Sequence, residues 1–172
     1  HNMTPRMFIV NLITGEIIYR HGHKETFHER NWIAFDSSPL VDAETDTLIW
    51  PSESGILYTI KLNTDYDVEA GTLSIDPVID RYWYESKVTT RPGMENSVAV
   101  YNHYAFFADN SGLITCLDLN TMTPVWSTKL GGDIEATPAL DLENGTALAL
   151  YTGNTVNGKK DTCVLSRINA LT

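Results

Sequence analysis

Basic residues are scarce in this sequence of 172 residues, and long apolar runs are missing from it. Twelve Lys and Arg stand against 22 Asp and Glu, which gives a formal charge of −10 at pH 7. A chain this acidic repels phosphate groups, so nucleic acid is not an expected partner. No stretch reaches the ~18 consecutive apolar residues of a membrane-spanning helix, so we expect no membrane-spanning segment.

Cysteine is rare as well, with Cys116 and Cys163 as the two examples. They occupy different places in the repeat described below, because Cys116 lies further along its strand. A bond between unmatched positions would often exceed the ~7 Å limit on the Cα separation of a disulfide. We therefore favour two buried free thiols over a disulfide.

Four strand-like apolar runs end in the same turn motif. In this motif Asn or Asp, and once Lys, is followed by Thr three places later. The four copies are Asn11–Thr14, Lys61–Thr64, Asp118–Thr121 and Asn169–Thr172. The segments Ser54–Thr64 and Ser111–Thr121 align without a gap. A repeat of ~40 to 60 residues that consists of short strands and turns, without a helical period, is typical of β-propeller blades.

Each full repeat contains four strand-like segments, so we predict an all-β fold of four-stranded antiparallel blades and no helix. The predicted partition is a partial blade at 6–31, blades at 37–91 and 92–133, and a partial blade at 136–172. Within it, the stretch Asp65–Arg91 is the least repeat-like and is interpreted as an insertion. Three to four blades are fewer than most closed propellers have, so we expect an incomplete propeller segment.

The third repeat resembles the blade motif of the quinoprotein alcohol-dehydrogenase-like propellers, the PQQ-like family. That motif has the form Ala-x-Asp-x-x-Thr-Gly-Lys-x-x-Trp. The segment Cys116–Trp126 keeps the Asp, the Thr and the Trp of the motif but has Met122 in the place of Gly. The segment Ile9–Tyr19 keeps the Thr and the Gly, with Asn for Asp and Tyr for Trp.

The resemblance implies that the motif residues are structural. An aromatic side chain on the outermost strand packs against the next blade, while the Asp and the Thr satisfy backbone groups of the turn. The blade-docking residues expected on this basis are Asn11, Thr14, Tyr19, Asp118, Thr121 and Trp126.

Many members of this family bind no quinone, and a quinone enzyme of the family would carry two adjacent cysteines, a Ca²⁺ ion and a catalytic Asp. This chain has no Cys-Cys pair. We therefore expect a non-catalytic scaffold or protein-interaction module without a cofactor, which binds a protein partner or the remaining propeller blades. The resemblance implies an exported bacterial protein. The alternative is a section of a quinone-dependent dehydrogenase or ligand-binding propeller whose site is completed outside this chain.

One acidic stretch has the spacing of a Ca²⁺ loop, with oxygen ligands at positions one, three, five and twelve. Its candidate ligands are Asp65, Asp67, Glu69 and Asp76. Gly71 at position seven and the short Asp at position twelve depart from the pattern, so an acidic solvated loop is the favoured alternative. A second candidate is a zinc site, for which the possible ligands are His21, His23, Glu25, His28 and Glu29. A flexible polar loop explains the same residues equally well.

The insertion also contains the aromatic cluster Tyr82, Trp83 and Tyr84. Trp and Tyr are enriched at interface hot spots, so the cluster is a candidate partner surface. Alternation along a strand would instead bury Trp83 and expose its two neighbours.

Overall fold

The computed structural model of the chain describes residues 6–22, 34–85, 88–143, 146–156 and 159–170, and within these ranges every regular element is a β-strand. The expectation of an all-β fold without helices therefore holds for these residues. The same part of the chain has no helix that could cross a membrane.

Four antiparallel sheets follow one another along the chain, and we call them the first to fourth blades. The first blade has two strands and the fourth has three: β1 Met7–Val10 and β2 Ile17–His21; β13 Ala139–Glu143, β14 Thr146–Val156 and β15 Lys159–Asn169. The second and third blades have four strands each: β3 Leu40–Asp42, β4 Thr47–Pro51, β5 Ile56–Lys61 and β8 Val78–Trp83; β9 Ala99–Tyr101, β10 Tyr104–Ala108, β11 Leu113–Asp118 and β12 Thr123–Lys129.

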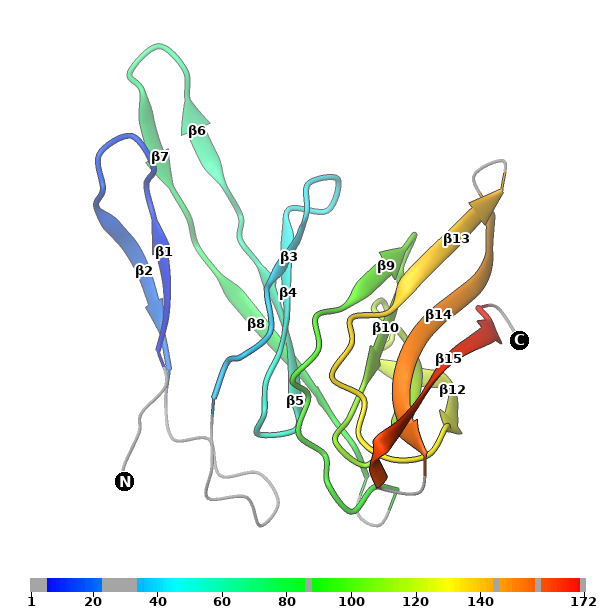
Figure 1. Ribbon diagram of the computed structural model, residues 1–172. Helices are drawn as coiled ribbons and strands as arrows, with labels where there is room; N and C mark the ends of the chain where they lie inside the picture. The colour runs from blue at the N-terminus through cyan, green and yellow to red at the C-terminus, as the bar shows by residue number, and fades with distance from the viewer. Residues whose placement is uncertain (1–5, 23–33, 86–87, 144–145, 157–158, 171–172) are drawn as a thin grey trace.

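Figure 1 shows the blades next to one another in chain order, from β1 and β2 on the left to β13, β14 and β15 on the right. The second and third blades have the orders β3-β4-β5-β8 and β9-β10-β11-β12, so β8 and β12 are the edge strands at matching ends of their sheets. A fifth, two-stranded sheet of β6 (Asp65–Asp67) and β7 (Thr72–Ser74) interrupts the second blade between β5 and β8. The insertion expected in this stretch is thus a hairpin of its own, followed by the strand that completes the blade.

The core lies between the blades, and two neighbouring residues of β10 show why. Phe106 and Phe107 are both fully buried. Phe107 packs with Leu57 and Tyr84 of the second blade and its following linker, whereas Phe106 packs with Leu150 of the fourth blade. Because successive side chains of a strand point to opposite faces, the inner strands of a blade with neighbours on both sides bury apolar residues on both faces.

Glycines bring the turn between the second and third strands of a blade close to the chain that links two blades. Gly112 has φ +86°, and a Cβ atom there would lie 2.0 Å from the carbonyl oxygen of Gly132. Gly55 has φ +83°, and a Cβ atom there would lie 2.8 Å from the Cβ of Pro92. Both positions need a residue without a side chain, for the backbone conformation and for the close approach.

The two cysteines are free, and one of them differs from the expectation. Cys116 is buried in the core between the third and fourth blades, where burial raises the pKa of its thiol to about 12. Cys163 is exposed on β15, so the prediction of two buried thiols is wrong for this residue.

Candidate binding surface of the second and third blades

The aromatic cluster of the insertion belongs to β8 and the residue after it. Tyr82 and Tyr84 are buried, with exposed fractions of 8% and 4%, and both pack against Phe107 of the third blade. Trp83 points to the other face of the strand and is 38% exposed. The alternation along β8 therefore buries the two tyrosines and exposes the tryptophan, which is the opposite of the expected pattern. Of the three candidate partner-surface residues, only Trp83 lies at the surface.

Trp83 forms part of a groove of about 630 Å³ between β8 and β12, which we call the rim groove. On the second-blade side, Arg81 and Val88 lie beside Trp83, and Met122 and Pro124 line the third-blade side. Trp, Arg and Met are residue types that are enriched in protein interfaces. The rim groove thus combines aromatic and aliphatic side chains with polar ones, and it lies between the two blades that have four described strands.

A second groove, of about 480 Å³, lies between the same two blades and has a charged lining that includes Asp42, Lys61, Asp80 and His103. Several of these charges serve the turns. Asp42 accepts the Thr45 hydroxyl at 2.6 Å and the Glu44 backbone N–H at 3.0 Å, and these hydrogen bonds lower the pKa of its carboxyl group. The Lys61 ammonium group donates to the carbonyl oxygen of Thr45.

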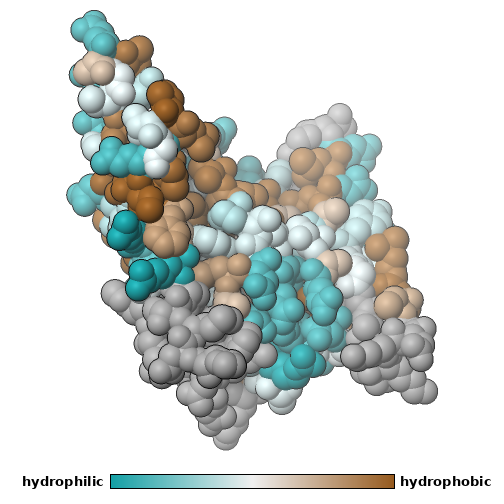
Figure 2. Space-filling view, turned by 60° about the vertical axis from the view of Figure 1, so that its left-hand side comes forward, coloured by the Kyte–Doolittle hydropathy of each residue, from teal (hydrophilic) through white to brown (hydrophobic). Residues whose placement is uncertain are grey.

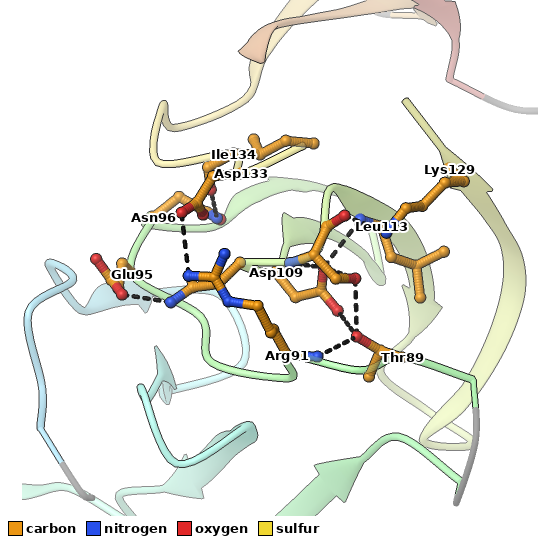
Figure 3. Close-up of polar contacts among 11 residues, drawn as sticks. Thr89, Arg91, Glu95, Asn96, Asp109, Leu113, Lys129, Asp133 and Ile134 are labelled. Carbon is orange, nitrogen blue, oxygen red and sulfur yellow. Dashed lines mark hydrogen bonds and ion pairs between the residues drawn. The ribbon is translucent and has the colours of Figure 1, made fainter. Parts of the chain in front are cut away.

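A network of polar side chains, shown in Figure 3, joins the turn between β10 and β11 to the linkers on either side of the third blade. Its centre is Asp109, which is fully buried. One carboxylate oxygen of Asp109 accepts the backbone N–H groups of Ser111 at 2.9 Å and Leu113 at 2.8 Å, and the other accepts the Thr89 hydroxyl. Donors from two segments therefore fix the turn against the linker that follows β8.

Asn96 holds the same region together from the other side. Its side-chain amide group donates to the carbonyl oxygens of Ala108 at 2.8 Å and Ile134 at 3.0 Å, and its oxygen accepts the Ala108 N–H at 3.1 Å. Nearby, the Arg91 guanidinium group lies 3.3 Å from a carboxylate oxygen of Asp133. These contacts tie both linkers of the third blade to its second strand.

Two buried oxygens in this network have no hydrogen-bond partner among the described residues, namely Oδ1 of Asn110 and Oδ1 of Asp133. The amide nitrogen of Asn110 donates to Glu95, so its oxygen is the part left over. Both oxygens are acceptors, and water or a ligand with N–H or O–H groups would satisfy them.

The sequence motifs did not single out these network residues, although the repeat contained a signal for them. Ser52 and Asp109 stand 57 residues apart, just before the two segments that align without a gap. Each caps the following turn, since Ser52 accepts the Ser54 N–H at 3.2 Å as Asp109 accepts that of Ser111. An alignment extended by two residues would have found the pair.

The proposed Ca²⁺ ligands do not come together. Asp65 and Asp67 lie on β6 and pair with Ser74 and Thr72, whereas Asp76 follows β7 at the base of the hairpin. Asp67 accepts the backbone N–H groups of Glu69 and Ala70, both at 2.9 Å, so its carboxylate closes the turn. Strand pairing thus takes the place of the candidate ion-binding loop, and the favoured acidic loop is a hairpin. Within the described residues, no three His, Cys, Asp or Glu side chains are grouped closely enough to hold a metal ion.

Of the possible zinc ligands, only His21 lies among the described residues. His21 is buried at the end of β2, and its ring makes an edge contact with Tyr58 at a centroid distance of 5.5 Å. The other candidates, His23, Glu25, His28 and Glu29, lie outside the described residues.

The motif residues of the first blade cap their turn and contact the second blade. Asn11 accepts the N–H groups of Ile13 at 2.9 Å and Thr14 at 3.3 Å, and Thr14 accepts that of Glu16 at 3.2 Å. Tyr19 packs on the cluster that joins the first two blades, and burial raises the pKa of its phenol.

In the third blade, Trp126 donates from its indole nitrogen to the carbonyl oxygen of Ala170 in the fourth blade at 3.3 Å. Asp118 accepts the Asn120 N–H at 2.8 Å, and the hydroxyls of Thr121 and Thr123 lie 2.6 Å apart. Met122, in the place of the motif's Gly, has φ 54° and packs against the core between the second and third blades. Its side chain gives an interblade contact that the family's Gly would lack.

The second blade has Lys61 where the motif has Asp, and another carboxylate takes the role. Asp46, in the turn between β3 and β4, accepts the N–H and the hydroxyl of Thr64 at 2.7 Å and 2.8 Å. These bonds lower the pKa of Asp46.

The architecture is similar to that of β-propellers of known structure. BamB from Moraxella catarrhalis has a TM-score of 0.58 and 15% identity, over 97% of this chain and 44% of that one. The β-propeller domain of Cps50 (Swd1) from Myceliophteria thermophila has a TM-score of 0.55 and 14% identity, over 95% and 48%. A chain of the mitotic checkpoint complex has a TM-score of 0.55 and 14% identity, over 97% and 41%.

These similarities show that the chain folds as part of a β-propeller, and that it spans less than half the length of these structures. No model of a known protein family matches the sequence, and neither does a curated protein. At identities of 14–15%, the comparison establishes the fold and leaves the function to the residues of the site.

Proposed function

We propose that this chain is a PQQ-like propeller section that serves as a non-catalytic protein-interaction module of an exported bacterial protein. The family assignment rests on the blade-docking motif and on the contact of Trp126 with the next blade. The location outside the cytoplasm follows from that family resemblance. One structure with the same fold is part of a protein complex, the mitotic checkpoint complex, which agrees with an interaction role.

The observation that carries the proposal is the rim groove. It is about 630 Å³ in volume and has the half-exposed indole ring of Trp83 in its lining. The groove is open along β8 and β12, two edge strands that each have, within the described sheets, one side of the backbone without a strand neighbour. An extended peptide segment of a partner protein fits such a site, because apolar side chains can enter the groove while the peptide backbone follows the strands.

Selection from a displayed library of random peptides tests this function. We expect selected peptides whose affinity falls about tenfold or more in Trp83→Ala, as is typical of an aromatic hot spot. Val125→Ala is the matched control, because Val125 is an exposed residue of β12 that lies outside the rim groove. Peptides that bind both variants as tightly as they bind the wild-type chain would contradict the proposal.

The alternative is a ligand-binding or quinone-dependent propeller whose site is completed outside this chain. The observation in its favour is that one side-chain oxygen each of Asn110 and Asp133 has no hydrogen-bond partner in the described part of the chain. Both residues lie beside the half-exposed Arg91. Titration of the protein with pyrroloquinoline quinone and Ca²⁺, followed by absorption and calorimetry, separates the two. Our proposal predicts no saturable binding, whereas quinone binding that Arg91→Ala abolishes would favour the alternative.

A further inference from the structure

The hairpin of β6 and β7 stands clear of the blade from which it emerges. Figure 1 shows it as the outermost part of the molecule, beside the hairpin of β1 and β2. Both hairpins rise from one core cluster, to which Met7 and Tyr19 belong on one side and Leu62 and Ile79 on the other. The β6–β7 hairpin is closed at its base by the bond from the Asp76 N–H to the Leu62 carbonyl at 3.0 Å.

Large apolar side chains are exposed at the ends of both hairpins. Val68 is 76% and Tyr66 is 52% exposed, while Leu12 and Ile13 in the turn between β1 and β2 are 96% and 83% exposed. Figure 2, which brings this side forward, shows hydrophobic residues along the projecting corner. We call these four residues the hairpin corner. Apolar side chains grouped at a projecting surface are typical of an interaction site.

The neighbouring blades do not cover this surface. The second blade, which carries the β6–β7 hairpin, packs against the first blade on one side and the third blade on the other, and both are described in the structure. With all of these present, Val68 and Tyr66 are still exposed. The described strands of the adjacent blades therefore leave both side chains accessible to a partner.

The charge of the hairpin specifies the partner further. Between Leu62 and Ile79 the charged residues are Asp65, Asp67, Glu69 and Asp76, all of them acidic. The strand pairing places Tyr66 opposite Leu73, while Asp65 and Asp67 point to the other face with Ser74 and Thr72. An apolar surface with carboxylates at its border complements an apolar surface with basic residues at its border.

We propose that the hairpin corner binds a protein segment that combines apolar side chains with Lys or Arg. The proposal rests on the interaction function proposed above and gives it a second, separate contact surface. Apolar side chains of the partner bury Val68 and Leu12. Its basic groups face Glu69, which follows Val68 in the turn, and reach around the edge of the hairpin to Asp65 on the other face. The partner's cationic charge raises the association rate with this acidic protein and makes binding dependent on salt.

The test uses fluorescent model peptides, of alternating Lys and Leu, of alternating Glu and Leu, and of alternating Lys and Ser. We expect the Lys-Leu peptide to bind most tightly. The variant Leu12→Ser/Val68→Ser should weaken its binding about tenfold or more, because both apolar anchors are lost. Both residues are exposed, so the fold does not depend on them. Asp65→Asn/Glu69→Gln should weaken binding a few-fold and reduce its dependence on salt.

Matched controls lie on the fourth blade. Leu142→Ser/Leu165→Ser removes two other exposed apolar residues, and Asp141→Asn/Glu143→Gln removes two other exposed charges. Both should bind within about twofold of the wild-type chain, which separates a local contact from general attraction to an acidic protein. Equal losses in the controls, or none in the hairpin variants, would overturn the proposal.

Two further measurements identify the occupant. Vesicles of phosphatidylcholine and phosphatidylglycerol should not bind, and vesicle binding that depends on Leu12 and Val68 would replace the protein partner by a membrane surface. If the Lys-Leu peptide fails while selected peptides still depend on Trp83, the hairpin proposal alone is wrong. If, in addition, no selected peptide binds in a way that depends on Trp83, the interaction function itself is wrong.

Discussion

At the scale of single residues, blades are joined by contacts that tolerate little change. The turn glycines touch the neighbouring linker with their backbones, Trp126 donates a hydrogen bond across to the fourth blade, and Asn96 bonds to two segments at once. Each of these residues acts between elements and not within one. Substitution at such a residue therefore affects two blades together.

Gly112→Ala should destabilise the protein strongly, since the new Cβ would lie 2.0 Å from the Gly132 carbonyl oxygen. Gly71→Ala is the matched control, because Gly71 also has positive φ but its new methyl group would meet no neighbouring side chain or backbone atom within 4 Å. The control should lose about 1 kcal/mol for the backbone conformation alone. Urea unfolding measures both, and similar losses would contradict the close approach at Gly112.

Trp126→Ala should lower the free energy of unfolding by about 3 kcal/mol, because it removes a packed aromatic ring and its bond to the fourth blade. Val125→Ala, at the exposed position next to it, should cost less than about 1 kcal/mol. Thermal or urea melts compare the two variants. Equal midpoints for Trp126→Ala and the wild-type chain would show that the blade-docking interpretation of the motif is wrong.

Alkaline pH should destabilise the protein through the buried tyrosines. Burial raises the pKa of Tyr82 from 10.0 to about 12, and it raises the pKa of Tyr84 as well. Their stabilising effect is therefore complete below pH 10 and is lost as the pH rises toward 12, because the unfolded chain releases these protons first.

Urea unfolding at increasing pH tests this expectation. Tyr82→Phe/Tyr84→Phe should make the stability less dependent on pH between 10 and 12, the range set by the Tyr82 pKa values. A dependence on pH as steep as that of the wild-type chain in this double variant would refute the assignment.

At the scale of elements, the sequence predicted the regular repeats well and the interrupted one poorly. The strands of the third blade follow from the gapless match of 54–64 with 111–121. The position of β8 could not be predicted from that match, because the β6–β7 hairpin displaces β8 along the chain. Alternation along β8 also predicted the wrong face for Trp83. It separates the side chains of a strand into two faces, but it does not say which face is more deeply buried when both contact other parts of the protein.

The β6–β7 hairpin should fold without a metal ion. Strand pairing holds Asp65 and Asp67 on β6, and the turn uses the Asp67 carboxylate, so no ion is needed to neutralise a cluster. We expect the same melting temperature in EDTA and in millimolar Ca²⁺. An upward shift in Ca²⁺ that Asp67→Ala abolishes would contradict this, since ligand binding to the native state raises its stability.

At the scale of the whole molecule, repetition predicted the propeller, whereas the candidate binding surfaces were predicted only in part, through Trp83. The rim groove brings Trp83 and Met122 together from different blades, and the hairpin corner combines the β1–β2 and β6–β7 hairpins, which lie next to each other in Figure 1. These juxtapositions depend on how blades pack and not on a motif. The acidic spacing of 65–76 suggested an ion because only the pairing of β6 with β7 reveals where each carboxylate points.

Hydrogen exchange should rank the blades by the number of faces that are covered. The third blade packs through Phe107 on one face and Phe106 on the other, so β10 and β11 should exchange most slowly. β1 and β2 pack through Met7 on one face, while Phe8 and Val10 on the other are exposed, and should exchange faster. Mass spectrometry of peptide fragments measures both. Equal protection of the two blades would contradict the ranking.

The backbone hydrogen bond between Asp76 and Leu62 at the base of the hairpin has a consequence for how this blade can change over evolution. The chain leaves the blade after Lys61 and returns at Val78, and these two residues are themselves a cross-strand pair. Leu62, Asn63 and Thr64 are bonded to Asp76 and Asp46 at the base of the hairpin. A segment of another length or sequence can therefore replace the residues beyond Thr64 while β5 and β8 keep their register. The hairpin is therefore an exchangeable part, through which related chains can acquire new binding specificities without redesigning the propeller.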